Sequence, residues 1–510
     1  MPGVTRRALT FTIGESNRAL GTGCFVAARP PGAGIEPRPN PQGVTMSITW
    51  KETGGTWEPD HTLLGGPMKN AAFLAAALLA AVAGPSFAKN LRIPITRVNS
   101  VPVKCADEPL GTCHNRWHPG IDPVMEANPG DIVTFETRDA FDNPFNRDTT
   151  PADVAAPNLN LIHPLTGPLR VNGAHRGDVL AVTMIDVQPG PDFFGYTVAV
   201  PGFGFLRDVF TDPAIVHWEL DRVAKNGRTR YATSKDLPGV RVPLHGFAGT
   251  IGVELGEPEI EKAFLREDEL RKVEGFVLPP EPRDAVPAKL CGPSGPARER
   301  CLRTIPPREN GGNTDVKQMV NGTTLLFPCF IEGCGLSIGD VHWAQGDGEV
   351  SGTAIEMNAI VTVKVEVRKA LAAKYGNWPR LESNRSGVLR ELEPDDFVAT
   401  MGIPVKPAGI VIQPEKWFHS DPQLAPLTNQ SEDVTLAARD ALLKMINLLT
   451  ESSTSPAPKP LTRVQAYLLC SVACDLRISN LVDVPNYVVS DFLHLDVFET
   501  RGGDGSGNDD

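Results

Sequence analysis

The chain has 510 residues, of which 41% are hydrophobic and 22% charged, an ordinary composition for a globular protein. Its formal net charge of −12 argues against a nucleic-acid-binding groove, which would need clustered basic residues. Glycine (48) and proline (47) are frequent and only 6% of residues are aromatic, which favours a body rich in strands and loops. Composition therefore favours a strand-rich body over a helical bundle.

The N-terminal region carries the pattern of an export signal. Met68-Lys69-Asn70 precedes an uncharged apolar run, and Ser86-Phe87-Ala88 places small residues at a cleavage position. The run is shorter than the roughly 20 apolar residues of a membrane-spanning helix. Gly84-Pro85 would also break the alternative, a buried alanine-rich helix. We expect residues 68–88 to be a signal peptide and the mature protein to be periplasmic or secreted, without a membrane segment. Residues 1–67 are then non-native upstream sequence or a disordered extension.

Strand patterns dominate the chain from residue 91 onward. An extended segment over residues 91–103 leads into a polar loop. Ile132–Thr137 follows a Pro-Gly-Asp turn with alternating residues, and Val179–Met184 follows a similar Arg-Gly-Asp turn. Ile360–Val367 shows the clearest alternation of apolar and polar residues. Asn226-Gly227 predicts the turn of a hairpin.

Helical patterns lie mainly near the C-terminus. Apolar spacing after capping residues predicts helices over Val434–Leu449 and Val464–Cys474. Residues 257–308 are rich in proline and charge, and we expect them to form an excursion with one short helix at Glu261–Val273.

The cysteine spacing agrees with an oxidising compartment. Apart from Cys24, eight cysteines remain, and six of them form short-range pairs that predict local disulfides. The intervals do not match the paired CxxC spacing of zinc–thiolate sites. Cys470 and Cys474 lie one turn apart on a predicted helix, where a bridge is disfavoured, so we expect buried thiols. The predicted pairs are Cys105/Cys113, Cys291/Cys301 and Cys329/Cys334.

The densest group of polar residues lies between Ile305 and Met357. Asp340 and His342 are two residues apart, so their side chains share one face of an extended strand. Asp347 and Glu349 repeat this spacing among glycines that allow a tight turn. Carboxylates beside a histidine suit a divalent metal and also general acid–base catalysis. The alternative is an acidic turn region whose carboxylates only cap turns.

A serine nucleophile is disfavoured. Gly335–Gly339 has the letters of the G-x-S-x-G nucleophile elbow, which requires a strand, a strained turn and a helix. A glycine-rich turn follows here in place of the helix, so Ser337 lacks the expected context.

The run Pro307–Glu349 resembles the signature of the acetamidase/formamidase family, with PRENGGN-x-D followed by GD-x-H-x-x-QGDGE. Further similar blocks are spread along the chain. They are His114–Pro119, Thr137–Ala140, His163–Pro168, Asn172–Asp178, Pro201–Gly204, Tyr467–Leu469 and Asp475–Ile478.

The resemblance implies hydrolysis of the carbon–nitrogen bond in a small linear amide such as formamide or acetamide, giving a carboxylate and ammonia. It also implies a homo-oligomer and a catalytic domain over residues 89–501. The implied fold is mainly β (α+β), with mixed sandwich-like or barrel-like sheets and a few helices, which we expect toward the C-terminus. The tail at 502–510 is rich in Gly and Asp, and we expect it to be disordered. Family members are usually cytoplasmic, and the cysteine-bearing segment Pro328–Cys334 departs from their pattern. An exported hydrolase of a larger or cyclic amide therefore remains an alternative. A non-catalytic periplasmic binding protein is another, although it would have no need for such a costly carboxylate cluster.

We expect water activated by a divalent metal, zinc being the first choice. Either Glu349 or Glu309 would move the proton to the leaving amine. A carboxylate acting on water without a metal is the alternative. The expected ligands are drawn from Asp139, Asp315, Asp340 and His342, with Asp347 as a further catalytic residue. We expect the oxyanion to be stabilised by Arg308, Asn310, Asn313 and the backbone N–H groups of Gly311-Gly312. We expect substrate to be bound by His118, His163 and Gln345. The two histidines are also candidates for metal ligands or general acids.

Overall fold

The computed structural model forms two compact units, Met1–Ser86 and Phe87–Asp510. In the first unit β1 (Ala8–Phe11), β2 (Met46–Thr53) and β3 (Thr56–Pro59) form an antiparallel sheet. The rest of residues 1–67, the expected signal peptide before Ala88 and the tail at 502–510 lie outside the described residues. The structure describes residues 8–11, 46–53, 56–59, 88–224, 229–272, 277–383, 385–393, 396–404, 433–482 and 487–499.

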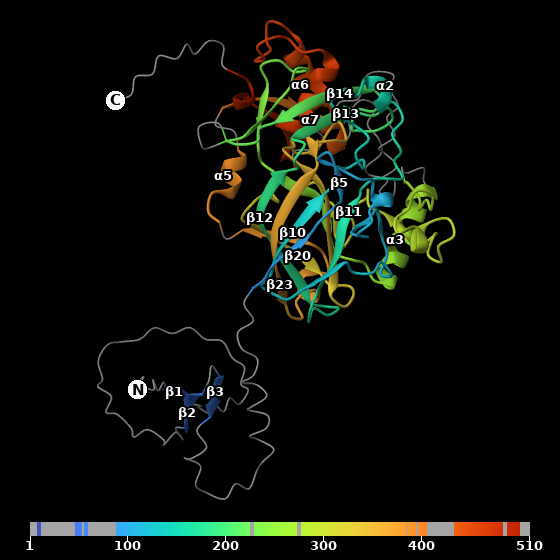
Figure 1. The fold of residues 1–510 in the computed structure, drawn as a ribbon. Helices are drawn as coiled ribbons and strands as arrows, with labels where there is room; N and C mark the ends of the chain where they lie inside the picture. The colour runs from blue at the N-terminus through green and yellow to red at the C-terminus, as the bar shows by residue number, and fades with distance from the viewer. Residues whose placement is uncertain are drawn as a thin grey trace, which may run out of the picture. The chain divides into compact units, whose positions relative to one another are not determined.

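A six-stranded sheet lies at one end of the second unit (Figure 1). Its central strand β23 (Ala359–Arg368) buries Val361, Val363 and Val365 and turns the residues between them outward. This is the period-2 pattern of a strand with one face in the core. The strands predicted at Ile132–Thr137 and Ile360–Val367 are therefore confirmed. The other strands are β10 (Ile132–Thr137) and β4 (Asn90–Ile93) on one side, and β12 (Val179–Pro189), β20 (Thr323–Pro328) and β24 (Arg380–Ser383) on the other.

An eleven-stranded sheet carries the polar cluster. Its strand β21 (Cys334–His342) is buried along its whole length. It pairs with β11 (Leu165–Val171), β17 (Phe247–Gly252) and β22 (Glu356–Met357), and β17 also pairs with β19 (Gly311–Asn313). The remaining strands are β7 (Cys113–His114), β9 (Met125–Ala127), β13 (Phe194–Ala199), β14 (Ala214–Leu220), β15 (Tyr231–Thr233) and β16 (Arg241–Pro243).

The mainly β expectation is confirmed, and within the described ranges none of the sheets closes into a barrel. Strands β14 and β15 are antiparallel neighbours, and the hairpin turn predicted between them at Asn226-Gly227 lies outside the described residues. The main hydrophobic core extends from the six-stranded sheet to the C-terminal helices. A smaller core around Phe141, Phe145 and Tyr196 lies beside the polar cluster.

The two C-terminal helices were both predicted and are confirmed. They are α6 (Val434–Thr450) and α7 (Arg463–Ala473), which lie together at the top of Figure 1. Thr462 begins α7 in a reciprocal capping box with Gln465. A three-stranded sheet packs against α6, with the strand order β25 (Phe397–Gly402), β27 (Val488–His494) and β26 (Cys474–Asn480).

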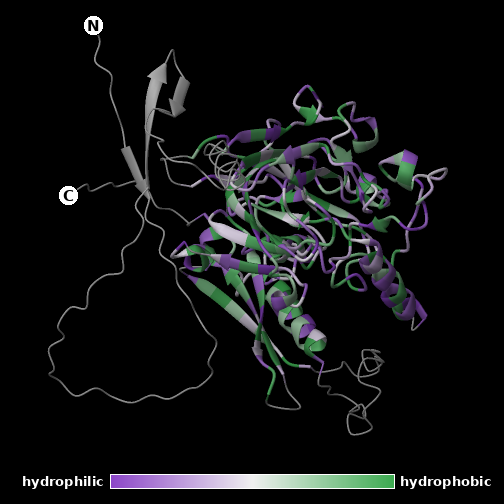
Figure 2. Ribbon diagram, turned by 90° about the horizontal axis from the view of Figure 1, so that it is seen from below, coloured by the Kyte–Doolittle hydropathy of each residue, from purple (hydrophilic) through white to green (hydrophobic). Residues whose placement is uncertain are grey.

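The excursion at 257–308 contains α3 (Glu257–Lys272), which begins one turn earlier than predicted. Only Glu259, Ile260 and Ala263 of α3 are buried, and the helix is largely hydrophilic in Figure 2. All three predicted disulfides are present, and Cys470 and Cys474 are free and buried as expected. Among the described residues, no helix has the length and apolar character needed to cross a membrane.

Candidate active site

Two neighbouring strands, β21 and β22, bring two carboxylates and one histidine together. Asp340 and His342 lie on β21, and Glu356 on β22 is directly opposite His342 in the strand register. Nε2 of His342 lies 3.3 Å from Oδ1 of Asp340 and 3.4 Å from Oε2 of Glu356. All three side chains are buried. The prediction that Asp340 and His342 share one face of a strand is confirmed.

A glycine makes room for this cluster. A Cβ atom on Gly249 of β17 would lie 2.5 Å from Oδ1 of Asp315 and 2.5 Å from Cε1 of His342. It would also lie 2.9 Å from Oδ2 of Asp340. Since real side chains do not tolerate such contacts, only glycine lets these three groups converge over the backbone. Ligand-type atoms of Asp315, Asp340 and His342 all lie within 4.8 Å of one another.

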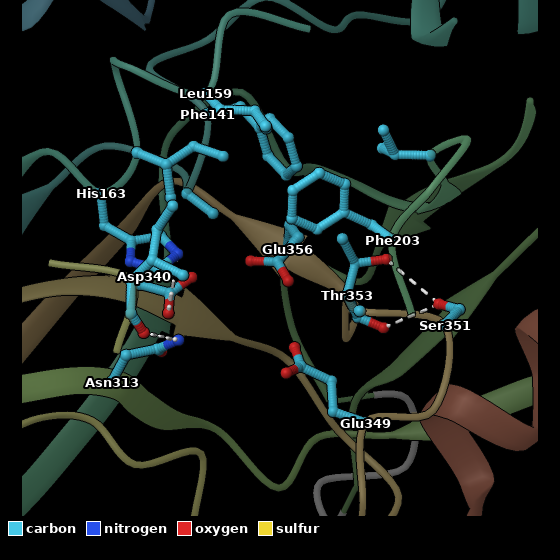
Figure 3. A pocket seen from close by; sticks show the side chains of 15 residues that line it. Phe141, Leu159, His163, Phe203, Asn313, Asp340, Glu349, Ser351, Thr353 and Glu356 are labelled. Atoms are coloured by element: carbon cyan, nitrogen blue, oxygen red, sulfur yellow. Dashed lines mark hydrogen bonds and ion pairs between the residues drawn. The ribbon is translucent and has the colours of Figure 1, made fainter. Parts of the chain in front are cut away.

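Glu349 joins the cluster from a tight turn. Ligand-type atoms of His342, Glu349 and Glu356 also lie within 4.8 Å of one another. Figure 3 shows Glu349 and Glu356 approaching the same space from different segments of the chain. Asp315, Asp340 and Glu349 have φ values of 47°, 52° and 42°, a region that side-chain-bearing residues rarely adopt. Such backbone strain clusters at functional sites.

Burial and neighbouring charges shift the pKa values of the cluster in different directions. Burial, followed by the charge of Asp340, raises the pKa of Asp315 to about 8. Burial raises the pKa of Glu356 to about 7 although His342 opposes it, and burial with Asp315 raises the pKa of Glu349 well above its usual value. Burial acts the same way on Asp340, but the two neighbouring histidines outweigh it and lower its pKa. For His342, Glu356 and Asp340 outweigh burial and raise the pKa well above its usual value. The cluster can therefore hold and exchange protons near neutral pH.

A cavity of about 90 Å³ lies over the cluster (Figure 3). His163 borders it, with Nε2 3.7 Å from Oδ2 of Asp340. Thr250 donates a hydrogen bond of 2.9 Å to the same oxygen. The polar lining consists of His163, Asn313, Asp340, Glu349, Ser351, Thr353 and Glu356, and the apolar lining of Ala140, Phe141, Leu159, Ile162, Val200, Phe203 and Ile305.

Most of the PRENGGN run does not line this cavity. Glu309 pairs with Arg266 of α3, and Arg308 donates to Glu267 of the same helix. The side chain of Asn310 donates to the carbonyl of Val253. These three residues hold the excursion and the strands in place, and of the run only Asn313 borders the cavity.

Four other residues expected at the site lie outside both the cavity lining and the acid–histidine cluster beneath it. Oδ1 of Asp139 accepts hydrogen bonds from the backbone N–H groups of Phe141 and Asn143. These bonds fix the turn that places Phe141 in the cavity lining. The side-chain amide of Gln345 donates a hydrogen bond of 2.9 Å to the backbone carbonyl of Asp315, so Gln345 helps to position Asp315. Asp347 lies 3.9 Å from Nζ of Lys317. His118 lies 3.8 Å from Glu257 of α3.

The sequence reasoning missed Glu356, Gly249 and Thr250. Glu356 had a usable signal, because it is a lone charged residue between the apolar Ile355 and Met357. Gly249 and Thr250 had none, since their importance comes from the pairing of β17 with β21.

Buried carboxylates and imidazoles with shifted pKa values, beneath a small cavity whose lining is partly apolar, are typical of a catalytic site. The chain belongs to the acetamidase/formamidase family, whose sequence model matches residues 102–500. The resemblance read from Pro307–Glu349 is thereby confirmed.

Individual relatives agree with this membership. The chain is 30% identical over 402 residues to a formamidase of Methylophilus methylotrophus, covering 76% of this chain and 90% of the relative. It is 32% identical over 284 residues to an acetamidase of Mycolicibacterium smegmatis, covering 52% and 68% respectively. A solved structure of a gamma lactamase from Delftia acidovorans is similar, with a TM-score of 0.67 and 28% identity. That match covers 81% of this chain and 94% of the lactamase.

Proposed function

We propose that this protein hydrolyses the carbon–nitrogen bond of a small linear amide, of the formamide or acetamide type, to a carboxylate and ammonia. The observation that carries the proposal is the acid–histidine cluster facing a cavity of about 90 Å³. A single water needs at least about 10–15 Å³ on a comparable measure, so this cavity suits a substrate of few heavy atoms. The formamidase and acetamidase relatives support the reaction class.

The donor set fits a divalent ion. Oδ1 of Asp315 is a buried oxygen without a hydrogen-bond partner among the described residues. Carboxylate and imidazole groups are ligands that Zn²⁺ accepts. Asp315, Asp340, His342 and Glu356 would hold the ion. When bound, it supplies Lewis acidity and lowers the pKa of a coordinated water toward neutrality.

We assign proton transfer to Glu349. Its side chain lines the cavity, and burial and the charge of Asp315 raise its pKa well above the usual glutamate value, which favours its binding of a proton. Glu349 takes a proton from the attacking water as the oxygen bonds to the carbonyl carbon. It then gives the proton to the nitrogen as the carbon–nitrogen bond breaks and ammonia leaves. Phe141, Phe203 and the other apolar lining residues exclude bulk water and limit the acyl group.

The test is ammonia release from formamide, acetamide, propionamide and benzamide, together with ring opening of a γ-lactam to its amino acid, which releases no ammonia and is followed by chromatography. We expect the fastest release from the two smallest amides, with a steep fall as the acyl group grows. Dialysis against a strong chelator should abolish activity, and Zn²⁺ should restore it. Activity that survives chelation, in protein free of metal, would show that the carboxylates act on water directly. Ammonia release from none of the amides would contradict the proposed function.

We also propose that the protein is exported and acts as a homo-oligomer. Three disulfides are typical of oxidising compartments and support export. N-terminal sequencing of protein recovered from the periplasm or medium tests this, with Lys89 as the expected first residue. Light scattering of the purified protein tests the oligomer, and a monomeric mass would contradict it.

A further inference from the structure

A second group of ligand-type side chains lies apart from the cavity. The sulfur atoms of Cys470 and Cys474 and a carboxylate oxygen of Asp491 all lie within 4.8 Å of one another, and all three residues are buried. Cys470 is in the last turn of α7, Cys474 begins β26, and Asp491 lies on β27. The pairing of β26 with β27 thus brings a third donor to a C-x-x-x-C segment.

Among the described residues, Asp491 has no hydrogen-bond partner that offsets the cost of its burial. Both of its carboxylate oxygens are buried without a hydrogen bond to any described residue. The nearby cations pair with a different carboxylate, since Lys317, Arg477 and His494 all contact Asp475. A buried carboxyl group that is left unpaired is costly, whether it is ionised or protonated. The structure therefore has a buried polar group directed at two free thiols.

We infer that Cys470, Cys474 and Asp491 bind a divalent metal ion of the zinc class. Thiolates and carboxylates are both established zinc ligands. The remaining position of a tetrahedral ion would fall to a backbone carbonyl or a water. Cys470 and Cys474 are free thiols and are therefore available as ligands, whereas the other six described cysteines are joined in disulfides.

The position of this site gives it a structural role next to the catalytic turn. The carbonyl of Ser471 accepts a hydrogen bond from the backbone of Gly346, and Oγ of Ser471 accepts one from the backbone of Ser351. Asp475 accepts a hydrogen bond from the backbone of Asp347. The segment 470–475 therefore holds both ends of the turn that carries Glu349. An ion that ties this segment to β27 stabilises the turn without touching substrate.

The test is a Co²⁺ titration of the full chain after removal of bound metal. Co²⁺ bound by cysteine gives an intense thiolate charge-transfer absorption in the near ultraviolet. The cavity cluster contains no cysteine and cannot produce this band. Because the cavity cluster can take up Co²⁺ as well, we expect the band to reach its maximum by two Co²⁺ per chain, to vanish in Cys474→Ser, and to need at least about tenfold more Co²⁺ in Asp491→Asn. It should persist unchanged in Asp340→Asn, which alters only the cavity cluster.

Absence of the band from the unmodified protein would overturn the inference, whatever the variants do. Persistence of the band in Cys474→Ser would overturn it as well. Mass analysis of alkylated peptides decides the remaining case, because a disulfide between Cys470 and Cys474 in freshly purified protein would also refute the site.

Discussion

Asp340 stays ionised in a buried cluster because its neighbours favour the charged form. His163 and His342 supply positive potential, and Thr250 donates a hydrogen bond to Oδ2. Without these contacts, burial alone would raise the pKa of Asp340. The charge of Asp340 in turn raises the pKa values of Asp315 and Glu356, so one carboxylate influences the protonation of the whole site.

Thr250 offers a residue-scale prediction. Thr250→Val preserves the shape of the side chain but removes the donor, whereas Thr250→Ser keeps the hydroxyl. A hydrogen bond to a buried charge contributes about 1.5–3 kcal/mol, so kcat/KM should fall about 10- to 100-fold in Thr250→Val. Steady-state ammonia release checks this. Equal rates for the serine and valine variants would show that the hydroxyl has no role in the site.

The residues of the site were only partly predictable from sequence. Asp340 and His342 were predictable because a two-residue spacing fixes their geometry on a strand. Glu309 and Arg308 were expected at the site because they adjoin it in sequence, yet their side chains turn toward α3. Gly249 and Thr250 could not be found, since strand pairing over about 90 residues of separation brings them to Asp340.

Individual elements were more predictable than the site. The capping box of α7, the alternation of β10 and β23 and the three local disulfides depend on residues close together in sequence. The order of strands in the eleven-stranded sheet depends on pairings between distant segments, which leave no local pattern. Residues 257–308 contain both a feature that depends on local sequence and contacts that depend on distant residues. Their helix was predicted, but its ion pairs with Arg308 and Glu309 were not.

The cap of α7 gives a prediction at the scale of the element. Thr462→Ala removes the side chain that accepts from the backbone of Gln465, while Thr462→Ser retains the hydroxyl. We expect the alanine variant to lose about 1 kcal/mol in the free energy of unfolding, as is typical of such caps. Urea denaturation measures the loss. An alanine variant as stable as the serine variant would mean that the cap contributes nothing to α7.

Asp475 links the C-terminal layer to the catalytic turn and sets a pH dependence for the whole molecule. Burial would raise its pKa, but its hydrogen bond with His494 and the charge of Lys317 outweigh burial and lower it. An unfolded aspartate has a pKa of about 3.9, so its ionised form stabilises the fold above about pH 4, and this stabilisation is lost as the pH falls toward the lower folded value. Groups with raised pKa values, such as Asp315, change stability only above about pH 4.

Asp475→Asn should therefore lose stability less steeply than the unmodified protein between about pH 4 and pH 2. Urea denaturation across that range provides the comparison. Parallel curves for the two proteins would show that Asp475 does not stabilise the fold through its charge.

The central claim is that the cavity cluster, with Glu349 as its proton-transfer group, performs amide hydrolysis. The most direct test is kcat/KM for ammonia release by Glu349→Gln, compared with Glu309→Gln at the rival base. Glu366→Gln, on an exposed part of β23, is the matched control. We predict a loss of about 10²- to 10⁴-fold for Glu349→Gln, with the other two variants close to the unmodified protein. Full activity in Glu349→Gln, or an equal loss in Glu309→Gln, would contradict the account.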